Sequence, residues 1–362
     1  MASPADRIAR LRLIRSNNIG PVTYCQLLAR FGSAEAALAA IPDLAARGGG
    51  RPPRLATQAE VEREFETVAR LGARYLFLGE EGYPPLLAEM EAAPPALIVK
   101  GDAALLDRQA VAIVGARNAS AAACRYARGL ARALGEAGLL VVSGLARGID
   151  SAAHDGALAT GTAAVIAGGI DVVYPPENEE RQQAVAERGL LIAEMPPGTE
   201  PRARHFPYRN RIIAGLSSGT VVIEAAPKSG SLITARLAAD FGREVMAVPG
   251  SPLDPRAQGC NLLIREGATL VQSAEDVLEA VRPSVIPPPR PRPPIRDAVA
   301  PATDTGDADR SALASLLGPT PVPVDELIRQ SGLAPALVPT ILLELELAGK
   351  LERHAGGKVS LA

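Results

Sequence analysis

Arginine and aromatic side chains alternate in one ten-residue segment, Arg-Ala-Arg-His-Phe-Pro-Tyr-Arg-Asn-Arg, which runs from Arg202 to Arg211. Guanidinium groups pair with phosphates, and aromatic faces stack on unpaired bases at about 1–3 kcal/mol per base. A solvated, charged loop is the alternative interpretation. Because Phe206 and Tyr208 stand between the arginines, the pattern favours a surface for nucleic acid. The candidate contact residues are Arg204, His205, Phe206, Arg209, Asn210 and Arg211.

Three other segments place glycine or serine beside a basic residue, just before a predicted helix. They read Gly115-Ala-Arg, Ser143-Gly-Leu-Ala-Arg and Lys228-Ser-Gly-Ser. Glycine lets backbone amides approach an anion, and the N-terminus of a helix adds partial positive charge. For the first segment, a tight strand-to-helix turn is an equally good interpretation. The candidate phosphate-binding residues are Gly115, Arg117, Ser143, Gly144, Arg147, Lys228, Ser229, Gly230 and Ser231.

None of these segments matches a glycine-rich motif for a nucleotide cofactor. Asn118 and Ser120 stand where Gly-x-Gly-x-x-Gly needs its later glycines, and Gly-x-x-x-x-Gly-Lys-Ser/Thr does not occur. The three cysteines, Cys25, Cys124 and Cys260, are too widely spaced for a metal site or a disulfide framework. The sequence therefore predicts no cofactor and no metal.

Asp150 and His154 are four residues apart and share one face of a predicted helix, so they could form an acid–base pair. Alternatively, Asp150 caps the helix and His154 bonds the backbone of a neighbouring segment. The motif contains no nucleophile. We therefore predict no catalytic residue, while the pair leaves residual enzymatic activity as an open alternative.

Short apolar runs precede these segments and are typical of strands buried on both faces of a sheet. Helical segments between most of them predict an α/β fold with a Rossmann-like, open, mostly parallel sheet. Ligands of such sheets bind outside the carboxyl ends of the strands, so the three turns and the arginine segment are expected on one side. Several anion-binding turns side by side suit a polymer of phosphates better than one nucleotide. The expected strands are 110–114, 139–143, 163–167, 190–194, 220–225 and 244–248.

Four regions follow from composition and periodicity. Residues 1–79 are expected to be helical and to form a small N-terminal SAM or helix-hairpin-helix-like module, and residues 80–282 to form the Rossmann-like DNA-binding domain. The proline-rich residues 283–303 predict an extended linker. Residues 304–362 predict three helices and a hairpin, which is a winged-helix-like domain.

The two end domains carry weaker signals. In the N-terminal module, Asp6 is expected to cap the first helix, and the turn from Asn18 to Pro21 separates two helices. Such a turn sometimes binds the DNA backbone, but we favour a packing or partner-binding module. The third helix of the winged-helix-like domain contains Glu344 and Glu346 and no Arg or Lys before Lys350. A DNA-reading helix should be basic, so we expect this domain to bind protein or to be structural.

The formal net charge of the 362-residue chain is −2, so a nucleic-acid site must be a local patch. The N-terminus has no apolar signal core, and no run approaches the roughly 18 apolar residues that a membrane span needs. We expect a cytoplasmic protein that does not bind membranes.

Three motifs closely resemble the DNA-processing protein A family (DprA, also called Smf). They are Ser143-Gly-Leu-Ala-Arg-Gly-Ile-Asp150, Phe206-Pro-Tyr-Arg-Asn-Arg-Ile-Ile-Ala-Gly-Leu216 and Ser229-Gly-Ser-Leu-Ile-Thr-Ala235. The similarity runs from about residue 83 to 280. Two positions depart from the family pattern, with alanine at 116 where serine or threonine is common and cysteine at 260 where threonine is common. Neither change removes a charge.

The resemblance implies a protein that binds single-stranded DNA independently of sequence. It implies that the chain protects incoming DNA, loads the RecA recombinase during natural transformation, and forms a homodimer through the Rossmann-like domain. It also implies DNA contacts at Arg117, in the basic segment with Arg204, Arg209 and Arg211, and in the loop from Lys228 to Ser231.

Two other functions stay open at this point. One is a nucleotide-processing enzyme, similar to phosphoribohydrolases, whose catalytic carboxylate would be Glu224. The segment from Ser229 to Thr234 resembles the glycine-rich loop of such enzymes only loosely. The other is a protein-interaction scaffold, which would leave the arginine segment unexplained.

Overall fold

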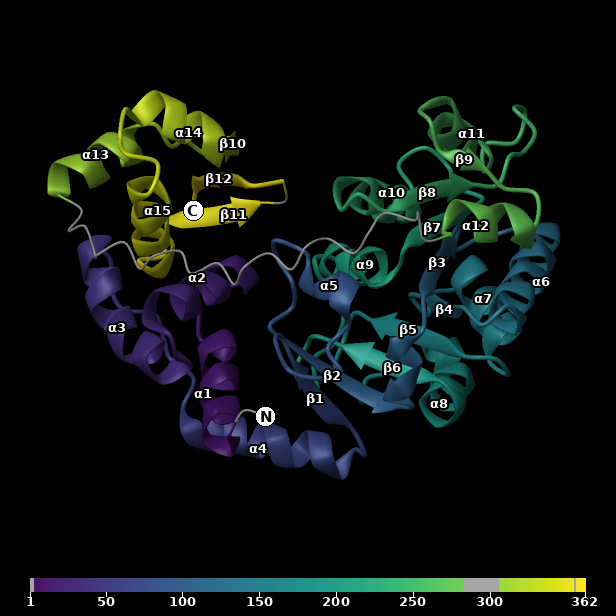
Figure 1. The fold of residues 1–362 in the computed structure, drawn as a ribbon, viewed down its shortest axis with the longest axis horizontal. Coiled ribbons are helices and arrows are strands. Elements are labelled where there is room, and N and C mark those ends of the chain that lie inside the picture. Colours follow the sequence, from purple (N-terminus) through teal and green to yellow (C-terminus); the bar gives the residue numbers. More distant parts are fainter. Residues whose placement is uncertain (1–2, 283–305, 355) are drawn as a thin grey trace. The chain divides into compact units, whose positions relative to one another are not determined.

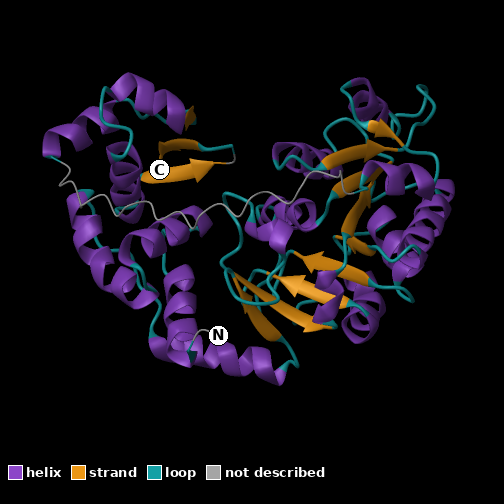
Figure 2. Cartoon of the chain, viewed as in Figure 1, coloured by secondary structure: helices purple, strands orange, loops and turns teal. Residues whose placement is uncertain are grey.

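The computed structural model describes residues 3–282, 306–354 and 356–362, and the predicted linker at 283–303 lies outside them. The described residues form two compact units. We call residues 63–282 the sheet unit, and residues 3–62 with 306–354 and 356–362 the helical unit. Figure 1 follows the chain through both, and Figure 2 separates helices from strands.

The sheet unit is built on a nine-stranded sheet in the order β1-β2-β6-β5-β4-β3-β7-β8-β9 (Figure 1). The strands from β6 through β9 in this order pair in parallel, whereas β2 is antiparallel to both β1 and β6. The predicted α/β, mostly parallel fold is confirmed. The strands are β1 (Arg74–Phe77), β2 (Ala96–Gly101), β3 (Ala110–Gly115), β4 (Leu140–Ser143), β5 (Thr162–Ile166), β6 (Leu190–Ala193), β7 (Gly219–Ile223), β8 (Glu244–Ala247) and β9 (Thr269–Leu270).

Helices cover both faces of this sheet, and β3 shows why its strands are apolar throughout. Val111 and Ile113 belong to one core cluster, and Ala112 and Val114 belong to the other. Successive side chains of a strand point to opposite faces, so a strand between two helical layers needs apolar residues at every position. One cluster includes residues of α6 (Ala121–Glu136), α7 (Ile149–Ala157) and α12 (Ala274–Ala280), and the other includes residues of α5 (Pro85–Ala88), α9 (His205–Leu216), α10 (Gly230–Asp240) and α11 (Gln258–Arg265).

The direction of winding changes at β3. The next strands along the chain, β4, β5 and β6, lie on one side of it, and β7, β8 and β9 lie on the other. Open α/β sheets bind ligands outside the carboxyl ends of their strands at such a switch point. The glycine-rich turn after β3 and the loop after β7 are therefore at the position where this architecture forms a site.

The expectation of a wholly helical region up to residue 79 is wrong, because β1 lies within it. The short segment Arg74–Phe77 pairs with β2 at the edge of the sheet. A four-residue apolar run has no periodicity that separates strand from helix. The strand β2 was also not predicted, and the two-residue β9 gave no signal in the sequence.

The helical unit contains the predicted N-terminal helices and the predicted winged helix. Ser3, not Asp6, caps the first helix, because its side chain accepts a hydrogen bond from the Asp6 amide. The strands of the winged helix are β10 (Val322–Pro323), β11 (Leu351–His354) and β12 (Lys358–Leu361), and β11 and β12 form the predicted hairpin. The helices are α1 (Pro4–Arg15), α2 (Pro21–Phe31), α3 (Ala34–Arg47), α4 (Gln58–Arg70, which continues into the sheet unit), α13 (Asp307–Ser315), α14 (Val324–Ser331) and α15 (Leu337–Leu347).

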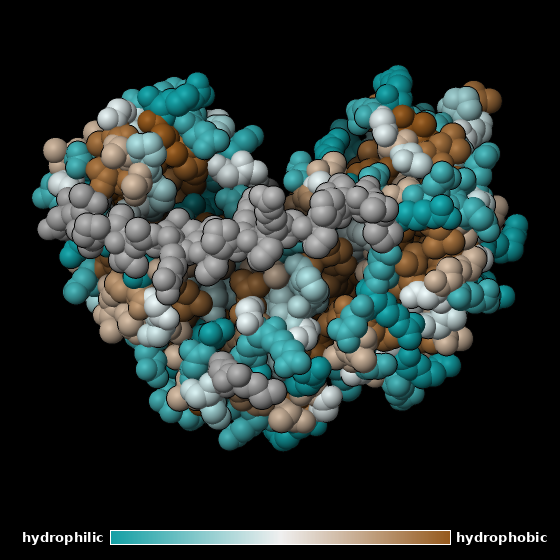
Figure 3. Space-filling model, viewed as in Figure 1, coloured by the Kyte–Doolittle hydropathy of each residue, from teal (hydrophilic) through white to brown (hydrophobic). Residues whose placement is uncertain are grey.

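On the face drawn in Figure 3, apolar side chains form separate patches between hydrophilic ones. Within the described ranges, no helix combines the length and apolar character that a membrane span requires.

Candidate nucleic-acid interface

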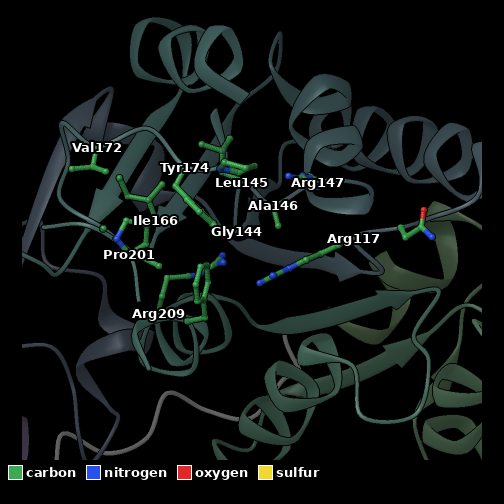
Figure 4. Close-up of a pocket in the computed structure, with 15 residues that line it drawn as sticks. Arg117, Gly144, Leu145, Ala146, Arg147, Ile166, Val172, Tyr174, Pro201 and Arg209 are labelled. Atoms are coloured by element: carbon green, nitrogen blue, oxygen red, sulfur yellow. The ribbon is translucent and has the colours of Figure 1, made fainter. Parts of the chain in front are cut away.

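A pocket with a volume of about 390 Å³ opens at the carboxyl ends of β3, β4 and β5 (Figure 4). Its walls come from the loops after these strands and from α9. The pocket brings together five residues from three separate predicted motifs: Arg117, Gly144, Arg147, Phe206 and Arg209. The sequence motifs therefore converge in space as the sheet topology required.

Arg117, Phe206 and Tyr174 lie next to one another along one wall of the pocket, with the two rings tilted by 54°. The guanidinium carbon Cζ of Arg117 lies 5.1 Å from the centroid of the Phe206 ring, and the centroids of the Phe206 and Tyr174 rings are 5.6 Å apart. Arg117 is exposed, and Tyr174 is 44% exposed. This wall presents aromatic rings and a cation together, which suits an unpaired base and its phosphate.

Arg209 reaches into the same pocket from α9 but is only 6% exposed. A Cβ atom on Gly144 would lie 1.4 Å from its Nη1 atom, so a glycine at 144 leaves the room for this guanidinium. Figure 4 shows the side chains of Arg117 and Arg209 extending toward each other. No group of the described residues hydrogen-bonds Nε or Nη1 of Arg209. Both atoms are enclosed by protein, so Arg209 brings an unneutralised hydrogen-bonding capacity and a positive charge to the wall of the pocket.

Asp150 borders Gly144 beside the Arg209 guanidinium, and its carboxylate holds the turn after β4. Its Oδ2 atom accepts hydrogen bonds from the amides of Gly144 at 3.2 Å and Ala146 at 3.3 Å. Burial raises the pKa of Asp150, and the charge of Arg209 opposes that rise. Burial lowers the pKa of Arg209 to about 10, and the charge of Asp150 opposes that fall. Arg209 thus carries its positive charge at neutral pH.

Arg147 also lines the pocket, where it forms an exposed ion pair with Glu177. The Nη2 atom of Arg147 is 2.6 Å from Oε1 of Glu177, and both side chains are at least half exposed. Such a pair is worth about 0–1 kcal/mol, so a phosphate can compete for the guanidinium.

The loop from Lys228 to Ser231 lies outside the pocket, at the start of α10. The Ser229 hydroxyl accepts a weak 3.4 Å hydrogen bond from the Ser231 amide and lies 2.8 Å from the Ser231 hydroxyl. Lys228 is exposed and has a positive φ of 72°. The side-chain amide of Asn210 donates to the Gly230 carbonyl at 3.4 Å, which joins this loop to α9. The loop therefore places a second cationic group, Lys228, after β7, which is the strand next to β3.

The structure removes two residues from the predicted contacts, because the fold itself uses their side chains. The buried Ser143 hydroxyl donates to the Ile113 carbonyl at 2.6 Å. The buried Arg211 pairs with Glu194 at 2.5 Å and donates to the Ala92 carbonyl at 2.7 Å. We no longer expect either side chain to contact a phosphate.

His205 and Arg204, adjacent at the start of α9, differ in what they offer. Arg204 is exposed, whereas His205 is buried and its Nδ1 atom accepts a 3.3 Å hydrogen bond from the Arg202 amide. Burial lowers the pKa of His205, and the charges of Arg204 and Arg202 lower it further. His205 is therefore neutral at pH 7, and Arg204 supplies the charge.

Gly115 and Glu224 position the loop that carries Arg117. A Cβ atom on Gly115 would lie 1.9 Å from the Ile223 carbonyl oxygen, so β3 and β7 approach too closely for a side chain there. The Ser120 amide and hydroxyl donate to the two carboxylate oxygens of Glu224 at 2.8 and 2.6 Å. Gly115 thus allows β3 and β7 to pack closely, and Glu224 fixes the far end of the Arg117 loop through its hydrogen bonds to Ser120.

His154 is buried and does not bond Asp150. Its Nδ1 atom lies 2.8 Å from the Thr162 hydroxyl, which itself donates to the Val141 carbonyl, so Nδ1 carries the hydrogen. The pair is not an acid–base pair, but the alternative was also wrong in detail: Asp150 does not cap α7, whose N-cap is Gly148, and His154 bonds a side chain in place of a backbone group. In the part of the chain that the structure describes, no cluster of three or more His, Cys, Asp or Glu could hold a metal ion.

Sequence reasoning missed Tyr174 and the apolar lining of the pocket. Tyr174 follows the third predicted strand and was visible as an aromatic residue in a glycine-rich loop. The apolar lining residues are of types that carry no chemical signal in a sequence: Leu145, Ala146, Ile166, Val172 and Pro201.

Residues 74–282 match the family model of DNA recombination-mediator protein A. The chain belongs to this family. Residues 4–67 match the DprA-like N-terminal HHH domain, and residues 288–357 match the DprA winged helix domain. The resemblance found in the motifs is thereby confirmed.

Individual relatives agree with this assignment. The chain is 47% identical over 201 residues to DNA processing protein DprA of Streptococcus pneumoniae, which covers 55% of this chain and 71% of the relative. It is 41% identical over 230 residues to DNA processing protein DprA of Bacillus subtilis, covering 61% and 77%. Protein Smf of Escherichia coli is 38% identical over 284 residues, covering 78% and 75%.

Two solved structures of the family are similar to this one. The X-ray structure of DNA processing protein A from Streptococcus pneumoniae matches with a TM-score of 0.67 and 37% identity, over 77% of this chain and 98% of that chain. DNA processing protein A from Helicobacter pylori, whose structure addresses its single-stranded DNA binding mode, matches with a TM-score of 0.52 and 29% identity. That match covers 57% of this chain and 94% of that one.

Proposed function

We propose that this chain binds single-stranded DNA without sequence preference, protects it, and loads the RecA recombinase onto it during natural transformation and recombination. The observation that carries the proposal is the pocket after β3, β4 and β5. There Arg209, a buried guanidinium with two donors that have no partner among the described residues, faces an exposed arginine, Arg117, that lies over an aromatic ring. Single-stranded DNA is a ligand that supplies both phosphates and unstacked bases.

The absence of sequence preference follows from the chemistry of these contacts. Guanidinium groups bind phosphates, which are the same at every nucleotide. Aromatic faces such as Phe206 and Tyr174 stack on any base, because each base has a π face. The bases of duplex DNA are stacked on one another inside the helix, so they cannot reach these aromatic side chains.

The remaining parts of the proposal rest on family membership. We infer a homodimer formed through the sheet unit and a direct interaction with RecA, as the family resemblance implies. We also infer that the chain works in the cytoplasm, uses no cofactor and performs no catalysis.

The alternative of a nucleotide-processing enzyme would need the Glu224 carboxylate as its acid or base. Both oxygens of that carboxylate accept hydrogen bonds from Ser120. The position of Glu224 therefore favours a role in holding the Arg117 loop, which supports the binding function.

Substitution of Arg117 by alanine tests the proposed site. Arg117→Ala removes a charge-assisted phosphate contact and the cation over Phe206, which we expect to cost roughly 1.5–3 kcal/mol, or about tenfold to a hundredfold in Kd. The measurement is fluorescence anisotropy of labelled oligo-dT at moderate salt. Circular dichroism and thermal melting establish that the variant is folded.

Arg188→Ala is the matched control. Arg188 is exposed at the end of α8 (Glu179–Arg188), just before β6 and so at the opposite end of the strands from the pocket. Arg188→Ala removes the same unit of charge as Arg117→Ala, and we expect the Kd of Arg188→Ala to equal that of the wild type. Equal affinity of Arg117→Ala and wild type would remove Arg117 from the site.

A further inference from the structure

The helix α15 is buried on every side, unlike a DNA-reading helix. Eight of its residues, 338 and 341–347, are buried, including Glu344 and Glu346. A helix that is apolar all round packs against protein on more than one face. The third helix of a winged helix reads DNA from an exposed, basic face, which α15 does not have.

Two different cores share α15. Val338, Ile341, Leu342 and Leu345 belong to the core of the winged helix. Leu343 and Leu347 belong instead to the core cluster of the N-terminal helices, with residues of α1, α2 and α3. The sequence spacing agrees, because residues four apart lie on one face of a helix. The second face of α15 is thus occupied by the N-terminal module of the same chain.

Three consecutive glycines form the seat for the end of α15. A Cβ atom on Gly48 would lie 2.1 Å from the Glu344 carbonyl oxygen, and one on Gly50 would lie 2.4 Å from the Ala348 carbonyl oxygen. Gly48 has φ −66° and ψ −2°, a conformation that any residue adopts. Glycine is needed at this position for the approach of the α15 backbone and not for its own geometry.

Polar contacts close the edge of this interface. Arg353 donates from Nε to Glu346 at 2.7 Å and from Nη2 to the side-chain oxygen of Gln26 on α2 at 3.3 Å. The turn at Asn18 lies at the end of α15, where a Cβ atom on Gly349 would be 3.3 Å from the side-chain Nδ2 atom of Asn18. That turn, in which Asn18 stays exposed, is the part of the N-terminal module that could contact a DNA backbone.

We propose that the winged-helix domain is an intramolecular docking domain, with the N-terminal helical module of its own chain as its partner. Docking through α15 buries the third helix of the winged helix, the element that this domain type uses to read DNA, and brings the Asn18 turn next to the end of that helix. The two ends of the chain thereby form one structural unit that leaves strand binding to the pocket of the sheet unit. This inference does not depend on the ligand of that pocket.

The glycine seat provides the test, by hydrogen–deuterium exchange on the full-length chain. Gly48→Ala and Gly50→Ala each place a methyl group against the α15 backbone. We expect backbone amides of α15 and α3 to exchange roughly tenfold faster or more, because undocking lowers the local stability of both domains. Amides of β3 and β7 in the sheet unit should exchange as in the wild type.

The response of α15 decides the question, because residue 48 is remote in sequence and belongs to the other domain. Damage to the N-terminal module alone would raise exchange in α3 and leave α15 unchanged, and this outcome would overturn the proposal. Gly20→Ala is the control, since its Cβ meets nothing within 4 Å and its φ is −89°. It should exchange as the wild type does in both helices.

Discussion

His154 is a buried imidazole that the fold keeps neutral. Its pKa is lowered to about 3, mainly by burial and also by the charges of Arg181 and Arg209, while the charge of Asp155 opposes the fall. Its Nδ1 atom is bonded to Thr162, and among the described residues Nε2 has no partner. Protonation of Nε2 would therefore place an unpaired charge in the core next to the site.

This burial predicts a pH dependence of stability. The folded-state pKa of His154 lies below the unfolded value of about 6.5, so its contribution is present above pH 6.5 and is lost as the pH falls toward 3. We expect the wild type to lose about 1.4 kcal/mol of unfolding free energy per pH unit below pH 6 more than His154→Asn does. Asparagine keeps a donor near Nδ1 and does not titrate.

Urea denaturation of both proteins at about one-unit steps between roughly pH 7 and pH 4 measures the difference in slope. His205 and the carboxylates titrate in both proteins and cancel in the comparison. Parallel pH profiles would show that His154 is protonated in the folded state.

The arginine segment shows how far sequence reasoning reaches at the level of single residues. The spacing identified a basic, aromatic segment beside the site, and the structure places Phe206 and Arg209 in the pocket. The spacing could not distinguish the role of Arg209 from that of Arg211, because these roles depend on which face of α9 packs against the sheet. Two residues apart on a helix, they point in different directions, and Arg211 meets Glu194, whose position only the fold determines.

At the level of elements, α6 contains two glycines with opposite surroundings. Gly129 is exposed, and a Cβ atom there meets nothing within 4 Å. Gly135 is buried, and a Cβ atom there would lie 1.9 Å from the Thr160 hydroxyl oxygen. Both lie inside the helix, where alanine is intrinsically better than glycine by roughly 0.5–1 kcal/mol.

The pair predicts opposite effects on stability. Gly129→Ala should raise the unfolding free energy by roughly 0.5–1 kcal/mol, because it gains helix propensity without a contact. Gly135→Ala should lower it by roughly 1–3 kcal/mol, because the methyl group must displace Thr160. Chemical denaturation of both variants measures the difference. Equal stabilisation by the two changes would show that α6 does not pack on the Thr160 segment as described.

The parallel strands were predictable from sequence, and the edge strands were not. Continuous apolar runs mark strands covered on both faces, which is the situation of β3 to β8. β1 and β2 pair antiparallel at one edge, and the partner of β2 is β6, which is remote in sequence. Local pattern carries no information about such a pairing. The order of the strands, and with it the pocket between separate loops, depends on these distant contacts.

The whole molecule is slightly acidic, so its affinity for a polyanion must come from a few local cations. The described candidates with exposed side chains are Arg117, Arg147, Arg204 and Lys228. Lys228 lies on the β7 loop outside the pocket, so its contribution tests whether the strand extends from the pocket toward α10. A ligand confined to the pocket would not reach it.

If these four cations and Arg209 all neutralise phosphates, log Kobs for oligo-dT should fall with log salt at a slope of about −3.5, and Lys228→Ala should reduce the magnitude by about 0.7. Lys100→Ala is the matched control, because it removes the same charge from β2, away from the carboxyl ends of β3 and β7. Its slope should equal that of the wild type. A change of the same size in both variants would mean that binding responds to net charge, and no change in Lys228→Ala would confine the strand to the pocket. A reduced slope in Lys228→Ala alone places the path of the DNA across the switch point between β3 and β7.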